Sequence, residues 1–174
     1  TVFMNGLIGE NKQPFLLRYN AESDEIELKL DEDNIYVIPK ETKFQNISIG
    51  LNNYKLTSYT DSKGQFVTGY LIEKSKGAIS LMKREKMIIK PEKIAQSSYE
   101  TYEPAKFIRG NDEYYLKLKD NSVVVFPKNK KGILELFPDQ KQAIEEFTKT
   151  NKTSFSNESS MIQLAQFISS TIAE

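Results

Sequence analysis

The chain has 174 residues, no Cys and no His, and its 24 basic side chains balance 24 acidic ones. The missing residue types exclude thiol nucleophiles, Ser–His and Cys–His catalytic pairs, and imidazole metal sites. A formal net charge of zero leaves no cationic surplus for binding nucleic acid. No apolar run reaches the roughly 18 residues that predict a transmembrane segment. Nine Tyr and ten Phe favour a folded, β-rich chain.

An internal repeat organises the chain. Residues 28–40 (LKLDEDNIYVIPK) align without a gap with residues 116–128 (LKLKDNSVVVFPK), and both end in Pro-Lys. With a three-residue gap the similarity extends upstream, so that residues 14–20 lie over residues 105–111. We therefore expect each copy to form a three-stranded antiparallel meander. The alternating apolar positions that predict a half-buried strand in each copy are Ile26, Leu28 and Leu30, and Tyr114, Leu116 and Leu118.

Further strands are expected between the copies. Their alternating or apolar segments span residues 43–49, 54–59, 65–74 and 78–89. The last two are joined by a short loop with a glycine, Gly77, which is typical of a β-hairpin. Residues 91–103 are polar and predict a linker or an excursion over the surface.

The periodicity becomes helical after Pro127. Residues 133–137 predict a short helix that ends before Pro138, and Pro138 with Asp139 begins a second one. Ser156 or Asn157 is expected to cap a third helix. The apolar positions of the last two helices are Ala143, Ile144 and Phe147, and Met161, Leu164, Ala165 and Ile168.

These elements predict an α+β protein that is mainly β. Duplicated antiparallel meanders, at about residues 14–40 and 105–128, would form a sheet, a sandwich or an open barrel within a β-rich body spanning residues 1–128. Residues 129–174 would form a C-terminal helical hairpin packed on one face or end of that body.

Residues 22–33 contain seven acids. Because Ca²⁺ binds six to eight oxygens, we consider this acidic composition as an indication of a calcium site. The order of ligands in a calcium loop is absent, so we interpret the segment as a solvated hairpin and predict no metal site. Glu25 and Glu27 point the same way from one strand, about 5–7 Å apart, which approaches the geometry of a paired-acid glycosidase. Exposed strand faces often carry such pairs, and no catalytic residue is assigned.

Arg18, Tyr19 and Asn20 precede the acids, and Arg can clamp a carboxylate through two hydrogen bonds. Because Arg and Asn recur in the second copy, an internal Arg–Asp or Arg–Glu bridge that fixes the meander is the favoured interpretation. The candidate binding residues are nonetheless Arg18, Tyr19, Asn20, Asp24, Glu25 and Glu27.

Four segments of the sequence form a recognisable set: RYNAESDEIE (residues 18–27), GYL (69–71), EYYL (113–116) and KKGILELFPDQKQAIEEF (130–147). Together they resemble a group of exported proteins from the cell envelope of Gram-negative bacteria. The resemblance implies export to the periplasm or outer envelope and a β-rich body with a helical tail. It supplies no activity, cofactor or catalytic position.

The absence of reactive side chains and the many aromatic residues favour a non-catalytic, exported or envelope-associated protein that binds a protein, a glycan or a small apolar ligand. The alternative is a carboxylate-dependent hydrolase that uses acids near Glu25 and Glu27 on an envelope or extracellular substrate. A third hypothesis is a structural domain whose helical tail docks on a neighbour. Nothing in the sequence indicates a cofactor.

Overall fold

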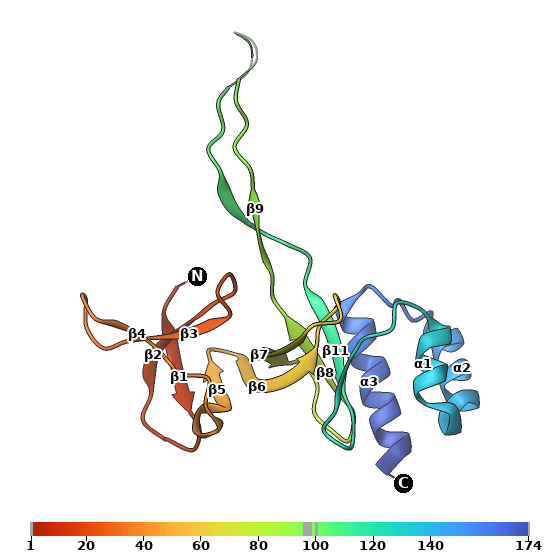
Figure 1. Ribbon diagram of the computed structural model, residues 1–174. Coiled ribbons are helices and arrows are strands. Elements are labelled where there is room, and N and C mark those ends of the chain that lie inside the picture. Colours follow the sequence, from red (N-terminus) through yellow and green to blue (C-terminus); the bar gives the residue numbers. More distant parts are fainter. Residues whose placement is uncertain (1, 96–98, 100, 174) are drawn as a thin grey trace.

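The computed structural model describes residues 2–95, 99 and 101–173 (Figure 1). Ten strands form one antiparallel sheet in the order β12-β11-β8-β7-β6-β5-β1-β2-β3-β4, so the α+β, mainly β fold is confirmed. Its strands are β1 (Met4–Ile8), β2 (Phe15–Asn20), β3 (Glu25–Lys29), β4 (Ile35–Val37), β5 (Asn46–Ile49), β6 (Asn52–Thr60), β7 (Phe66–Glu73), β8 (Ser80–Arg84), β11 (Glu113–Lys117) and β12 (Val123–Val125).

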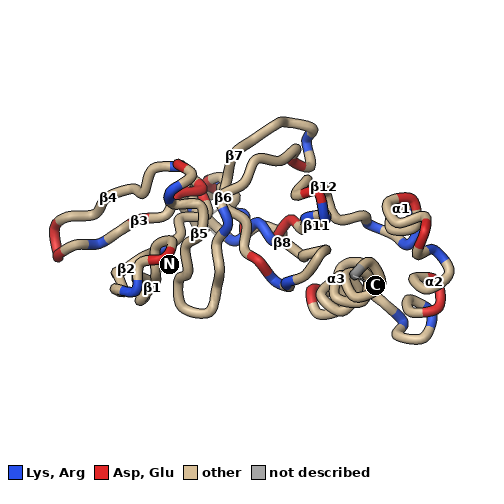
Figure 2. The backbone as a smooth tube through the Cα atoms, turned by 90° about the horizontal axis from the view of Figure 1, so that it is seen from below, with Lys and Arg blue, Asp and Glu red and all other residues tan. Residues whose placement is uncertain are grey.

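The sheet is curled (Figures 1 and 2). Strands β6 and β7 supply apolar side chains to both of its faces. Tyr54, Tyr70 and Ile72 lie on one face and pack with the buried side chains of β2, β3 and β5. Tyr59 and Leu71 lie on the other face and pack with residues of β8, β11 and β12. Because neighbouring residues of a strand point to opposite faces, the two strands serve two apolar cores.

A polar clasp closes the N-terminal core. Asp24, in the turn between β2 and β3, accepts hydrogen bonds from the Tyr19 hydroxyl at 2.8 Å and from the Tyr70 backbone N–H at 3.1 Å. Its other oxygen accepts one from Lys40 Nζ at 2.8 Å. Gly69 permits this approach, because a Cβ at that position would lie 2.3 Å from an Asp24 carboxylate oxygen. The far end of the sheet is thereby held against β7.

The helices cover the β8–β11 end of the sheet, on the face that carries Ile72. They are α1 (Lys130–Leu136), a 3-10 turn η2 (Pro138–Gln140), α2 (Lys141–Thr150) and α3 (Glu158–Ala173), which confirms the helical hairpin. Met161, Leu164, Ala165 and Ile168, the apolar positions expected on α3, are all buried in one cluster with Leu81, Leu116 and Phe126 of the sheet. The Asn157 side chain accepts the Ser160 N–H at 3.0 Å and so caps the start of α3.

The two repeat segments form hairpins with the same register. β3 pairs with β4 as Glu27↔Val37, and β11 pairs with β12 as Tyr115↔Val125, which are the positions equated by the ungapped alignment. The flanking backbone bonds correspond as well: Leu30 N–H to Asn34 and Leu118 N–H to Ser122. The strand before each hairpin differs. β2 pairs with β3, whereas Lys106–Arg109 (β10) does not pair with β11, so the second meander has only two of its three expected strands.

The segment expected as one strand, residues 78–89, divides into β8 and β9 (Met87–Lys90). β9 pairs with β10 and with no other strand of the described chain, and the ribbon projects away from the sheet (Figure 1). We call β9, β10 and the described residues between them the arm. The described residues of the segment expected as a linker or surface excursion instead extend the arm, with a bridge between Lys93 and Glu103. Residues 96–98 and 100 of that segment lie outside the described residues.

Two N-terminal elements were missed by the sequence patterns. β1 lies between β2 and β5 in the sheet although its alternation is weak, because Gly6 is the buried position. A Cβ on Gly6 would lie 2.2 Å from the Ser48 carbonyl oxygen, so the close strand contact requires glycine. Residues 43–49, expected as a strand, begin as a 3-10 turn (η1, Thr42–Phe44) before β5.

Candidate functional site

Three of the residues singled out in the sequence form an internal bridge. Arg18 on β2 lies opposite Glu27 on β3, and its Nε donates to Glu27 Oε2 at 2.9 Å. Asn20 Nδ2 donates to Glu27 Oε1 at 3.2 Å. The guanidinium also stacks 4.4 Å from the centre of the Phe3 ring. Glu27 is only 9% exposed, so the expectation that it lies on a solvated outer face is wrong. The expectation that Leu30 lies on the buried face is also wrong, because this side chain is 61% exposed.

Tyr19 and Asp24 belong to the clasp described above. Burial, and then the adjacent Asp24 carboxylate, raise the pKa of Tyr19 far above its usual value, so the hydroxyl stays protonated and donates to Asp24. Lys40 supplies the compensating positive charge. Each group has a structural partner, and the pair therefore fixes the turn between β2 and β3.

Glu25 and Glu27 do not form a paired-acid site. Glu27 is held by Arg18 and Asn20, and neither carboxylate lines the groove at the base of the arm or the smaller hollow beside α1 and α2. Within the described residues, no three acidic side chains gather closely enough to hold a metal ion. Five of the six candidate positions, all but Glu25, thus hold the first hairpin together. The structure offers a different place for ligands.

That place is an open groove of about 920 Å³ at the base of the arm. Its walls come from the arm, the β10–β11 connection, the end of β12 and the segment before α3. The apolar part of the lining comprises Ile88, Val125, Phe126, Phe155 and Met161, and the polar part includes Ser62, Lys86, Asp112, Glu113, Tyr114 and Lys128.

Glu113 organises the polar wall of the groove. Its Oε1 accepts Lys86 Nζ at 2.8 Å and the Ser62 hydroxyl, and its Oε2 accepts the Tyr115 hydroxyl at 3.0 Å. Burial opposes ionisation of this carboxylate, but these donors outweigh burial and lower its pKa. The acid is therefore fully ionised and fixed near neutral pH.

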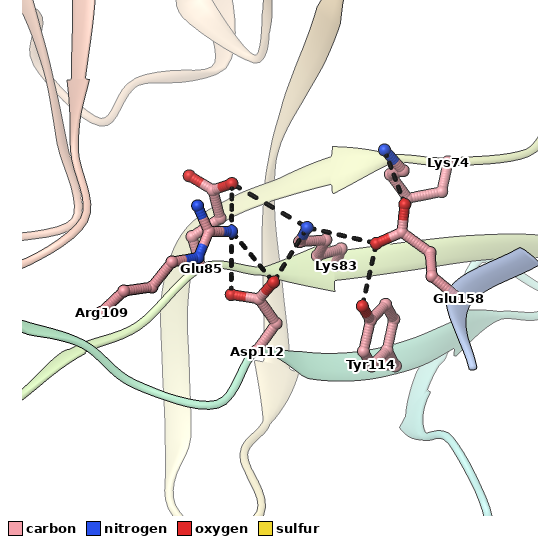
Figure 3. Close-up of polar contacts among 7 residues, drawn as sticks. All are labelled: Lys74, Lys83, Glu85, Arg109, Asp112, Tyr114 and Glu158. Carbon is pink, nitrogen blue, oxygen red and sulfur yellow. Dashed lines mark hydrogen bonds and ion pairs between the residues drawn. The ribbon is translucent and has the colours of Figure 1, made fainter. Parts of the chain in front are cut away.

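A second ionic network anchors the arm to the sheet and to α3 (Figure 3). Lys83 of β8 lies between Asp112 at 2.9 Å and Glu158 at 3.1 Å. Glu158 also contacts Lys74 at 3.0 Å and accepts the Tyr114 hydroxyl at 2.8 Å. Arg109 of β10 joins Glu85 at 2.8 Å to Asp112 at 3.0 Å.

The pKa values of this network do not suit proton transfer. Burial alone would raise the pKa of Glu158, but the bonds from Lys74, Tyr114 and Lys83 outweigh it and lower the pKa to about 2. Burial and the Glu158 contact raise the pKa of Tyr114 above its usual value. A general acid or base needs a pKa near the working pH. The geometry therefore provides a rigid platform with an apolar floor, which suits binding.

Sequence patterns could not have located this groove. Its lining comes from five separate segments between Ser62 and Met161, which only the folded chain brings together. One local signal existed: the apolar residues 87–89 lie between Lys86 and Lys90. Such a short apolar run between charged residues does not indicate which other part of the chain would cover it.

In comparisons with protein families, with curated proteins and with solved structures, nothing matches this chain. Among the described residues, no helix combines the length and the apolar character needed to cross a membrane. The class that fold and site support is thus a curled antiparallel β protein with a helical layer and a projecting two-stranded arm.

Proposed function

We propose that this is a non-catalytic binding protein, and that it docks a partner protein along the arm and in the groove at its base. One observation carries the proposal. The arm exposes large apolar side chains over its whole described length, each at about half of its surface or more: Ile88, Ile89, Ile94, Tyr99, Tyr102 and Phe107. Contiguous exposed apolar surface of this kind is typical of interaction sites.

The architecture of the arm supports the same function. A two-stranded ribbon is marginally stable by itself in water, and none of the three apolar cores of the described chain includes a residue of the arm. The ionic network of Figure 3 instead fixes the root of the arm at Arg109 and Glu85. A surface that is held outward and left uncovered gains apolar burial when a partner covers it.

A protein partner fits the site better than a small ligand. Sites for small molecules enclose most of the ligand surface, whereas this groove is open and continues onto a narrow ribbon through Ile88. Both strands of the ribbon also have one edge without a neighbouring strand among the described residues, and such edges accept strands from other proteins.

Site-specific photocrosslinking tests the proposal. A photoreactive phenylalanine analogue replaces Phe107 in the native cells, and the matched control replaces Leu51, which is fully exposed in the β5–β6 turn. We expect a discrete adduct from position 107, at least five-fold weaker when Ile89, the cross-strand neighbour of Phe107, is changed to Lys. Equal adducts from both positions, or none from position 107, would contradict arm docking.

Export to the periplasm or outer envelope is a second part of the proposal, and the resemblance noted above supports it. Fractionation of native cells is the corresponding measurement. We expect the protein in the envelope or periplasmic fraction. Co-purification with a cytosolic marker enzyme would rule out export but would leave the proposal of docking along the arm unchanged.

A further inference from the structure

The chain has a second uncovered sheet edge, at β4. Ile35, Tyr36 and Val37 are each about half exposed, and among the described strands β4 pairs only with β3. The Leu30 N–H bonds to the Asn34 carbonyl, and the Ile38 N–H bonds to the Ile26 carbonyl. In an antiparallel ladder this alternation points the N–H and C=O groups of Ile35 and Val37 away from β3, toward the open edge.

The arm presents a matching edge. Among the described strands, β9 and β10 pair only with each other, so each of them keeps one edge open. Open edges of this length with apolar side chains are predicted sites of pairing with another chain.

The internal repeat shows how an edge of this kind is covered. β12 corresponds to β4 in the repeat, and it lies against β6. Val123, the counterpart of Ile35, is 9% exposed and packs with Tyr59 and Leu71 of the β6–β7 hairpin. A hairpin bearing aromatic and aliphatic side chains thus covers Val123 in the second copy, whereas Ile35 is exposed in the first copy. Val125, the counterpart of Val37, is 39% exposed.

Charge separates the two uncovered edges. Residues 22–33, which adjoin β4, carry seven acids and one lysine, while residues 86–109 carry five cations and three acids. Asp24 and Glu27 are already paired, but Glu22, Glu25 and Glu32 have no ion-pair partner within the described chain. Figure 2 shows acids at the tip of the β3–β4 hairpin. The chain is neutral overall, yet an acidic edge and a basic arm attract each other.

We infer that the arm of one copy docks along the β4 edge of a second copy, so that the protein associates with itself head to tail. The inference rests on the proposed function and names its partner. Apolar complementarity comes from Ile35 and Val37 against Ile89 and Phe107. Lys90 and Lys106 both contact Glu103, at 2.7 and 4.0 Å, so two cations share one acid there and the acids beside β4 meet the remaining positive charge. Because the two surfaces differ, the contact is heterologous and each copy keeps one free edge of each kind.

Mixing two variants tests this arrangement. One variant, Ile35→Lys with Val37→Lys, loses the acceptor edge, and the other, Ile89→Lys with Phe107→Lys, loses the donor edge. All four side chains are about half exposed, so both variants should fold, which circular dichroism checks. Light scattering should give a mass for the wild type that rises with concentration above that of a monomer. Each variant alone should remain a monomer, and their equimolar mixture should form a one-to-one dimer and nothing larger.

A wild type that stays monomeric at high concentration, or a mixture that does not dimerise, would overturn the inference. The photocrosslink from position 107 separates the two failures: an adduct with a different protein would keep the proposed function and remove self-association.

A charge swap is the second part of the test. Glu22→Lys, Glu25→Lys and Glu32→Lys together should weaken association at least ten-fold at low salt, and Lys90→Glu with Lys106→Glu in the donor should restore it.

Discussion

At the scale of single residues, the buried tyrosines differ in how their hydroxyls are satisfied. Within the described chain the hydroxyls of Tyr59 and Tyr70 are buried without a hydrogen-bond partner, and burial raises the pKa of each to about 12. An unpaired buried hydroxyl costs free energy that a phenyl ring avoids. We predict that Tyr59→Phe and Tyr70→Phe leave the free energy of unfolding unchanged or raise it by up to about 1 kcal/mol.

The matched controls are Tyr19 and Tyr115. Their hydroxyls donate to the carboxylates of Asp24 and Glu113. Tyr19→Phe and Tyr115→Phe should lower the free energy of unfolding by about 1–3 kcal/mol, because each leaves a carboxylate with one donor fewer. Denaturant titration of the four variants measures the difference, and equal losses at all four positions would contradict the hydrogen bonds described here.

The lowered pKa of Glu158 predicts that part of the free energy of unfolding depends on pH in the acid range. Its pKa is lowered to about 2 from an ordinary 4.5. The folded protein holds the charged form more tightly, so the contribution is complete above about pH 4.5 and disappears as the pH falls through about 2. Since the side chain is 31% exposed and solvent screens part of the interaction, we expect about 2 kcal/mol.

Glu158→Gln should remove this contribution at pH 7 and flatten the loss of stability below pH 4.5. Glu135→Gln is the control, because Glu135 is 67% exposed and pairs only with Lys131 at 3.8 Å. Thermal unfolding from pH 2 to pH 7 makes the comparison. If both variants gave the same pH profile, the network of Figure 3 would not anchor α3 as described.

Among the binding residues predicted from the sequence, the bridge between Arg18 and Glu27 could be foreseen, because cross-strand neighbours in a hairpin follow from its register. The role of Asp24 could not. It depends on a positive φ of 55° in the turn and on the space left by Gly69 of β7, a residue 45 positions away. Close contact between distant backbones has no local sequence pattern.

At the scale of elements, the clasp makes its own prediction. Gly69→Ala would place a Cβ 2.3 Å from an Asp24 oxygen, so the turn between β2 and β3 must move away from β7. We expect a loss of about 2–3 kcal/mol in the free energy of unfolding, typical of breaking a buried polar network. Asp24→Asn should add little to that loss in the double variant, since both changes open the same contact.

The arm should be dispensable for folding. Replacement of residues 88–108 by Asn-Gly keeps the β8–β11 ladder together with Glu85 and Arg109, and removes no residue of the three apolar cores. We predict a change in unfolding free energy below about 1 kcal/mol, with loss of the position-dependent adducts and of self-association. A collapse of the fold, measured by denaturant titration, would show that the arm is part of the body.

The two hairpins of the repeat could be predicted from the sequence, but the different pairing of the strand before each hairpin could not. The ungapped repeat gave the correct register for both hairpins. The three-residue gap upstream had a consequence that the alignment did not reveal: it falls in the turn between the first two strands. Three residues, 110–112, separate β10 from β11, where four residues, 21–24, separate β2 from β3, and β10 pairs with β9 in place of folding back on β11.

At the scale of the whole molecule, composition correctly indicated a β-rich chain but concealed the distribution of its charges. Equal numbers of acids and bases excluded a cationic surplus, but they did not show that seven acids lie within residues 22–33, next to β4. Figure 2 shows acids at the tip of the β3–β4 hairpin. The projection of the arm was equally hidden, because alternating apolar residues predict a strand without indicating whether anything covers it. Exposure is a property of the fold, and here it defines the docking surfaces.

Hydrogen exchange measured at low and at high protein concentration tests the central claim most directly. The amides of β9 and β10 on the open edges of the arm, and those of Ile35 and Val37 on β4, should exchange rapidly when dilute. They should slow at least ten-fold when concentrated, while the amides of β1 keep one rate. If the arm and β4 exchanged at the same rate at every concentration, the docking surfaces described here would be wrong.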